Sequence, residues 1–199
     1  MSFNSIKKYL RENNIDVRGV LHVGSKSDSI QSTYNSINVH ENNVIWIESD
    51  MDKAARNLAN GLKNCFTTII DEKPAHNYVS SHNFCSGECC KEAPQLLLAE
   101  LEIKKMQTLA EFMATNNFDP KEFNIWNFDT MGSELRIFKS SPQLLQFADA
   151  IYTGVNSTEI TKKSTVKSEL DTLLRAHGLC RVETIKNEDN WCMALYIRL

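Results

Sequence analysis

Two acidic residues stand at the ends of strand-like segments, where they could hold a nucleoside. Glu48 closes the apolar run 43–48, and Asp129 closes the run 124–129. If both runs are parallel strands, their carboxyl ends meet at the edge where doubly wound sheets bind ligands. A carboxylate at the end of the second strand can accept hydrogen bonds from both ribose hydroxyls. The alternative for Glu48 is a solvated strand end.

The turn after Asp129 allows two compatible roles for its acidic residues. Residues 130–134 open a helix-like segment, so Asp129 or Thr130 can cap free N–H groups while Glu134 interacts favourably with the helix dipole. A carboxylate at this strand end also points into the crevice where ligands bind. We therefore keep a ligand-facing role for Asp129 beside the capping role.

Gly24 ends the first strand-like run and opens a turn. Backbone N–H groups at such a turn can receive the polar groups of a nucleotide. Dinucleotide-binding fingerprints have several glycines, whereas the segment 24–29 has one, so ordinary turn chemistry is the alternative.

The elements that must position these residues alternate along the chain. Strands are expected at 18–24, 43–48, 66–70, 124–129 and 148–155, with helices at 5–13, between 24 and 43, and at 51–62, 109–115, 133–145 and 166–177. This alternation predicts an α/β fold with a doubly wound, mostly parallel, seven-stranded Rossmann-like sheet. The last two runs, 180–185 and 191–198, are joined by a link that fits an antiparallel hairpin. We expect the N-terminal helix, within residues 1–16, to pack across the edge of the sheet.

Composition predicts a soluble, single-domain protein spanning residues 1–199. Hydrophobic residues make up 42% and charged residues 24%, which are ordinary values for a globular domain. A net charge of -3 argues against nucleic-acid binding through a cationic surplus. No apolar run is long enough to span a membrane and the N-terminus lacks a signal segment, so we predict a cytoplasmic protein with no membrane partner.

One segment, 74–106, fits neither a helix nor a strand and is predicted to be a lid or insert. It contains His and Cys residues close enough to suggest zinc: His76, His82, Cys85, Cys89 and Cys90. Their spacing matches no standard zinc arrangement, so we predict no metal site. The remaining cysteines lie in or beside strand-like runs and are expected to be reduced, buried thiols: Cys65, Cys180 and Cys192.

Several motifs in order resemble the FkbM family of S-adenosylmethionine-dependent methyltransferases. The segments 20–24 and 44–48 are similar to its first two motifs, and 127–135 is similar to its Asp-x-x-Gly-x-Glu motif. The runs 148–156 and 191–198 resemble its last two strands. A parallel sheet closed by a terminal hairpin is also typical of class I methyltransferases. The same hairpin and the poor glycine pattern count against a dehydrogenase.

The resemblance implies O-methylation of a hydroxyl-bearing small-molecule or glycan acceptor, with S-adenosylmethionine as cofactor. Asp129 and Glu134 would be the catalytic residues beside the transferring methyl group, and adenine would lie near Ile70 and Asp71. The full set of implied cofactor-binding residues is His22, Gly24, Ser25, Asp28, Glu48, Ser49, Ile70, Asp71 and Asp129.

At several positions this sequence lacks the polar residue that the FkbM pattern has. An acidic pair after Gly24 is missing, although Asp28 could substitute for it, and Lys26 would repel a sulfonium unless it points away. The other departures are Ser29, Ile30, Ala110, Gly154 and the pair Cys192-Met193. The alternative is therefore a catalytically degenerate methyltransferase-like domain that serves as an interaction or structural module.

Overall fold

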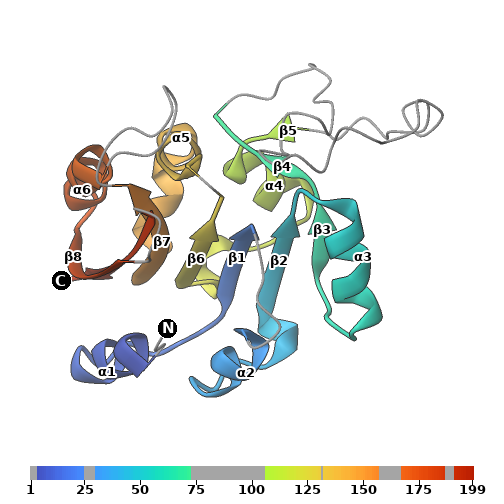
Figure 1. Ribbon diagram of the computed structural model, residues 1–199, viewed down its shortest axis with the longest axis horizontal. Helices are drawn as coiled ribbons and strands as arrows, with labels where there is room; N and C mark the ends of the chain where they lie inside the picture. Colours follow the sequence, from blue (N-terminus) through green and yellow to red (C-terminus); the bar gives the residue numbers. More distant parts are fainter. Residues whose placement is uncertain (1–3, 25–29, 73–105, 131, 157–166, 187–190) are drawn as a thin grey trace.

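The computed structural model describes residues 4–24, 30–72, 106–130, 132–156, 167–186 and 191–199. Its main sheet has seven strands in the order β3-β2-β1-β6-β7-β9-β8 (Figure 1). The strands are β1 Val20–Gly24, β2 Val44–Glu48, β3 Cys65–Thr67, β6 Ile125–Asp129, β7 Ala150–Asn156, β8 Leu179–Lys186 and β9 Trp191–Arg198. Neighbours from β3 to β7 are parallel, and β9 runs antiparallel to both β7 and β8. The predicted architecture, a doubly wound, mostly parallel seven-stranded sheet with a C-terminal antiparallel hairpin, is confirmed.

Helices cover both faces of this sheet. They are α1 Asn4–Glu12, α2 Ile30–Asn35, α3 Met51–Ala59, α4 Leu109–Thr115, α5 Glu134–Ser140 and α6 Lys167–Ala176. One core layer joins α4, α5 and α6 to the sheet, and the other joins α1 and α2 to the opposite face (Figure 1). The expected edge position of α1 is wrong, because Ile6 and Leu10 pack in the same cluster as Leu195 of β9.

The winding direction of the sheet reverses between β1 and β6. From β1 the chain proceeds outward through β2 and β3, and it then returns to the other side of β1 as β6. Such a switch point leaves a crevice outside the carboxyl ends of the two strands. Gly24 and Asp129 are register partners there, at the last position of each strand.

Two predicted elements are divided in the structure. The strand expected at 66–70 separates into β3 and β4 Ile69–Ile70, and β4 pairs with β5 Met106–Gln107 in a second, two-stranded sheet. The helix expected at 133–145 ends at Ser140, and a 3-10 helix follows over Pro142–Phe147. Pro142 has no N–H to donate and disfavours helical geometry in the residue before it, which explains the break.

Of the three cysteines expected in the core, Cys192 is buried, whereas Cys65 and Cys180 are only partly buried. The large aromatic side chains of Trp46 and Trp126 are buried. The segment predicted as a lid or insert lies outside the described residues, except for Met106 in β5. The helices within the described part of the chain are all too short or too polar to cross a membrane.

Candidate functional site

A cavity of about 300 Å³ lies at the carboxyl ends of β1, β2, β4 and β6. Its volume is at the lower end of the range for small-molecule sites. Charged residues from several elements line it together with Gly24: Glu48, Asp50, Lys53, Asp71, Asp129 and Arg136. The cavity therefore occupies the switch-point crevice at which a doubly wound sheet binds ligands.

Glu48 presents an unused acceptor to this cavity. The side chain is 5% exposed, and its Oε1 accepts a hydrogen bond from the backbone N–H of Asp50 at 3.0 Å. Its Oε2 is buried and has no hydrogen-bond partner in the part of the chain that the structure describes. Because buried polar atoms are normally paired, this oxygen calls for a donor from a ligand.

Asp129, at the end of β6, also has a carboxylate oxygen that no described residue satisfies. Its Oδ1 is buried without a partner among the described residues, as is the hydroxyl oxygen of Thr130 beside it. Burial raises the pKa of the Asp129 carboxyl, the positive charge of Lys53 opposes that rise, and the negative charge of Glu48 adds to it. The site would therefore gain from a ligand that brings a hydrogen-bond donor or a positive charge to Asp129.

Gly24 allows the two strand ends to approach. Its φ is +103°, and a Cβ atom built there would lie 1.9 Å from the carbonyl oxygen of Asp129. No side chain fits in that space. Gly24, which is expected to open a turn, therefore sets the spacing between β1 and β6 at the cavity.

The helix after β2 begins at the cavity rim. Asp50 caps α3, and its Oδ1 accepts from the N–H groups of Asp52 and Lys53 at 2.9 and 3.1 Å. The cap fixes the first turn of α3 against the end of β2. Lys53 consequently lines the cavity, a position that the sequence did not reveal.

Another part of the cavity lining combines an apolar surface with an ion pair. Ile69, Ile70 and Met106 supply the apolar surface. Beside them, Nη2 of Arg136 donates to Oδ2 of Asp71 at 3.0 Å. Arg136 lies in the first turn of α5, so its position at this wall follows from where that helix begins.

Glu134 stabilises the turn that carries Asp129. It is fully buried, and its Oε1 accepts from the backbone N–H of Thr130 at 3.0 Å. It is not among the residues that line the cavity. The structure thus places the predicted catalytic pair apart, with Asp129 at the cavity and Glu134 behind the turn.

No protein-family model and no curated protein matches this chain. Solved structures of methyltransferases are similar to it. Magnesium protoporphyrin IX methyltransferase from Synechocystis PCC 6803 with bound SAM has a TM-score of 0.47 and 8% identity, over 99% of this chain and 78% of that one. A putative tRNA (m1A22) methyltransferase, Sp1610 of Streptococcus pneumoniae, has a TM-score of 0.46 and 13% identity, over 96% and 69%.

A third similar structure is the 1,6-didemethyltoxoflavin-N1-methyltransferase of Burkholderia thailandensis with bound S-adenosylhomocysteine. Its TM-score is 0.44 and its identity 9%, over 98% of this chain and 77% of that one. With TM-scores below 0.5, these likenesses establish neither a family nor an activity for this chain. The FkbM resemblance therefore stays a prediction.

His22 does not reach the cavity. Along β1, Leu21 and Val23 face the layer of α4 and α5, whereas His22 faces the other layer and contacts Trp46 at a ring-centroid distance of 4.8 Å. Its Nδ1 lies 2.7 Å from the Tyr34 hydroxyl oxygen, which also accepts from Nδ2 of Asn127 at 2.7 Å. Burial raises the pKa of Tyr34, so the hydroxyl stays protonated. The predicted cofactor role of His22 is not supported by this geometry.

The other predicted cofactor residues divide into two groups. Ser49, Ile70 and Asp71 line the cavity, and their cofactor role stays a prediction. Ser25 and Asp28 lie outside the described residues, as do Lys26 and Ser29.

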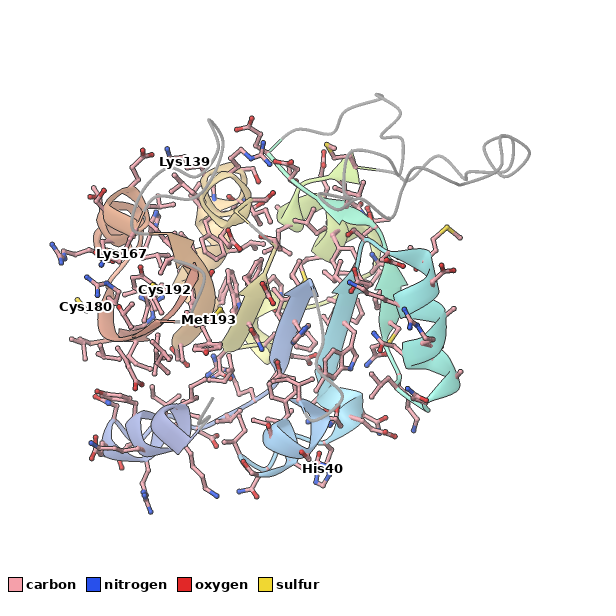
Figure 2. The ribbon with its side chains drawn as sticks, in the orientation of Figure 1. His40, Lys139, Lys167, Cys180, Cys192 and Met193 are labelled. Carbon is pink, nitrogen blue, oxygen red and sulfur yellow. The ribbon has the colours of Figure 1, made fainter. Side chains whose placement is uncertain are left out.

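The remaining departures from the family pattern fall on structural positions. Gly154 pairs with Met193 in the β7–β9 ladder. Figure 2 labels Met193 and its neighbour Cys192. Cys192 and Met193 are buried in the two core layers on opposite faces of the sheet. Ala110 donates its backbone N–H to the Ser141 hydroxyl at 3.0 Å. None of these residues lines the cavity, so their departure from the FkbM pattern does not change the described residues that line it.

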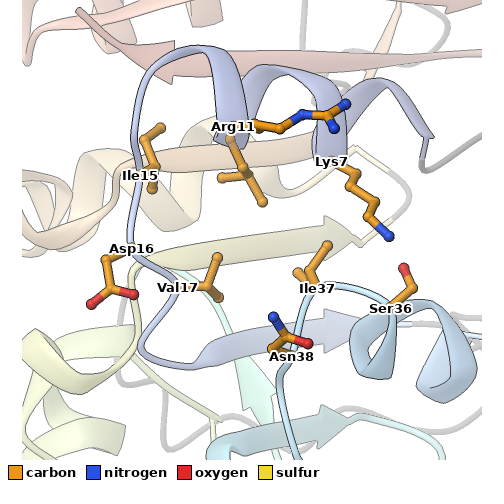
Figure 3. A pocket seen from close by; sticks show the side chains of 9 residues that line it. Lys7, Arg11, Ile15, Asp16, Val17, Ser36, Ile37 and Asn38 are labelled. Carbon is orange, nitrogen blue, oxygen red and sulfur yellow. The ribbon is translucent and has the colours of Figure 1, made fainter.

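A second cavity, of about 260 Å³, lies between α1 and the segment after α2 (Figure 3). Leu10, Ile15 and Ile37 contribute apolar surface, and Lys7 and Arg11 contribute exposed cations. Among the described residues it contains no buried polar atom without a partner. No cluster of metal-ligating side chains occurs in the described part of the chain either. The switch-point cavity is therefore the candidate functional site.

Proposed function

We propose that this chain binds S-adenosylmethionine in the switch-point cavity and methylates a hydroxyl group of a small-molecule or glycan acceptor. The observation that carries the proposal is the pair of buried oxygens, Glu48 Oε2 and Asp129 Oδ1, that have no partner among the described residues. Both oxygens are acceptors on one cavity at the switch point. The ligand that satisfies them must supply hydrogen-bond donors and is favoured if it is cationic.

The ribose of the cofactor supplies the donors for Glu48. Its two hydroxyl groups can both donate to a carboxylate at the end of the second strand. Oε2 is free to accept while Oε1 keeps its bond from the Asp50 N–H. The residues present therefore fit this part of the cofactor.

Asp129 faces the positive end of the cofactor and then the acceptor. When bound, S-adenosylmethionine supplies an electrophilic methyl group on a positively charged sulfur. The Asp129 carboxylate attracts that charge, and because burial raises its pKa it is a stronger proton acceptor than an exposed aspartate. Asp129 would accept the proton that a neutral hydroxyl acceptor releases when it is methylated. Glu134 contributes by holding the turn at Thr130.

The second candidate function is a degenerate, non-catalytic methyltransferase-like module. The observation that favours it is the ion pair between Arg136 and Asp71, which occupies the wall where adenine is expected. Such a module would not bind the cofactor, so ligand binding separates the two proposals.

The deciding experiment is thermal unfolding with S-adenosylmethionine or S-adenosylhomocysteine. At about 100 times the dissociation constant, binding adds roughly 2.7 kcal/mol to the free energy of unfolding, which is a rise of roughly 5–10 °C for a chain of this size. We expect that rise for the wild type, and its loss in Glu48→Gln, which removes the charged acceptor of the ribose hydroxyls.

Glu41→Gln is the matched control. Glu41 lies just before β2 and makes only an exposed ion pair with Lys63 at 3.4 Å, so its variant should keep the full shift. A wild-type protein that shows no shift with either ligand would favour the degenerate module. Equal shifts in Glu48→Gln and the wild type would remove Glu48 from the site.

A further inference from the structure

The cavity lining includes an arginine whose orientation is fixed by two partners. Nη2 of Arg136 donates to Oδ2 of Asp71 at 3.0 Å and to the Ser133 hydroxyl at 2.9 Å. The side chains of Arg136 and Asp71 are 25% and 15% exposed. With one nitrogen held from two sides, the planar guanidinium has little freedom to rotate.

A second nitrogen of the same guanidinium is unused. Nε of Arg136 is buried and has no hydrogen-bond partner among the described residues. The nitrogens of a guanidinium are donors only, so this N–H can be satisfied only by an acceptor atom. A buried donor with a fixed direction, on a residue that lines the cavity, indicates an acceptor atom on the ligand.

The inference about that acceptor rests on the proposed function. If the ribose lies on Glu48, the attached base must lie against a neighbouring wall of the same cavity. Ile69, Ile70 and Met106 provide the apolar surface that a flat ring needs, and Asp71 and Arg136 lie beside them. The acceptors on an adenine ring are its ring nitrogens.

Asp71 is less suited to read the base directly. Its Oδ1 already accepts from the backbone N–H of Glu72 at 2.7 Å, and its Oδ2 accepts from Arg136. We propose that Arg136 is the residue that recognises the base, by donating its Nε–H to a ring nitrogen of adenine. Asp71 and Ser133 position the guanidinium for this contact.

The test compares S-adenosylhomocysteine with its 1-deaza, 3-deaza and 7-deaza analogues, each of which replaces one ring nitrogen by C–H. Dissociation constants are measured by calorimetry. For the wild type we expect one of the three analogues to bind about tenfold more weakly or worse, because a hydrogen bond to a charged donor is lost. The other two should bind nearly as well as the parent compound.

Arg136→Lys is the informative variant, because lysine can keep the ion pair with Asp71 but has no N–H at the position of Nε. It should bind the parent compound about tenfold more weakly and should no longer distinguish the deaza analogues. Lys139→Met is the matched control, since Lys139 lies on the same helix and pairs with Glu169 at 3.6 Å, away from the cavity (Figure 2). It should keep the wild-type pattern.

Three results would overturn the inference, and they differ in what they say about the proposed function. If the wild type binds S-adenosylhomocysteine but Arg136→Lys still discriminates among the deaza analogues, Arg136 does not read the base, and the proposed function stands. If the wild type binds none of these compounds, both the inference and the proposed function fall. Equal binding of all the analogues by the wild type also excludes a ring-nitrogen contact.

Discussion

Asp129 and Asp171 are two partly buried aspartates that the fold treats in opposite ways. Asp171, on α6, accepts hydrogen bonds from Arg181 at 2.8 and 3.1 Å and from the Tyr196 hydroxyl at 2.8 Å. Asp129, at the end of β6, has a buried oxygen without a partner among the described residues. One carboxylate is satisfied by other residues of the chain, and we propose that the other is satisfied by a ligand.

The pKa shifts of the two carboxyls record this difference. Burial raises both, but at Asp171 the hydrogen bonds from Arg181 and Tyr196 outweigh burial, and the net pKa is lowered. At Asp129 burial is the largest influence and the net pKa is raised. Burial alone therefore does not distinguish the two carboxylates. What distinguishes them is that an oxygen of Asp129 is buried without a partner among the described residues.

The largest expected effect comes from disturbing the strand end that carries Asp129. Gly24→Ala places a Cβ against the Asp129 carbonyl at 1.9 Å and forces an L-residue to a φ of +103°. Left-handed strain costs roughly 1–2 kcal/mol and overpacking roughly 1–3 kcal/mol, so we expect a loss of about 2–5 kcal/mol in the free energy of unfolding. Chemical denaturation measures it.

Gly61→Ala separates the two causes of that loss. Gly61 also has a positive φ, +83°, but a Cβ there would meet no atom within 4 Å. Its variant should therefore lose only the strain component, roughly 1–2 kcal/mol. Equal losses at the two glycines would mean that the close approach of β1 and β6 is not what requires Gly24.

Asp171→Asn should lower the free energy of unfolding by a smaller amount, because it replaces the hydrogen-bonded carboxylate by a neutral amide. Because the folded-state pKa is lowered, the stabilisation by Asp171 is present above its unfolded pKa of roughly 3.9 and is lost as the pH falls through the folded value. We expect a loss of about 1–2 kcal/mol at pH 7 that shrinks steadily below pH 4. Denaturation across this pH range measures it.

Glu169→Gln serves as the control for Asp171. Glu169 lies on the same helix, but its pair with Lys139 is exposed on both sides, so its removal should cost less than about 1 kcal/mol. A loss as large as that of Asp171→Asn would show that any carboxylate on α6 has the same effect.

The sequence predicted the elements and the strand-end carboxylates of the site, because both follow from local pattern. Alternating apolar runs define the strands, and the chain order of the runs implies that Glu48 and Asp129 share one edge. Both line the cavity. The division of the 66–70 run was not predictable, since β4 forms by pairing with Met106 and Gln107, far along the chain.

The errors concern residues whose partners come from other elements. His22 has its hydrogen bond to Tyr34 on α2, and only the alternation of β1 hinted that it faces away from Leu21 and Val23. Arg136 and Lys53 reach the cavity because α5 and α3 begin at the carboxyl edge of the sheet. A helix start at this edge, followed by a long cation within its first turn, is a signal that could have identified both.

The smallest expected effect is a gain in the free energy of unfolding, and it comes from replacing Asp129. Because burial raises the folded-state pKa of Asp129, its ionisation destabilises the folded protein: stability falls as the pH rises from about 3.9, the unfolded pKa, through the folded value. Asp129→Asn removes that charge, so the ligand-free variant should be more stable than the wild type by about 1 kcal/mol at pH 7, with little gain at pH 4. Denaturation at the two pH values tests this. The same variant should bind S-adenosylmethionine more weakly, since the sulfonium loses its counter-charge. A variant that is less stable at pH 7 would mean that the protein already satisfies this carboxylate, as it does Asp171, and the distinction between the two aspartates would disappear.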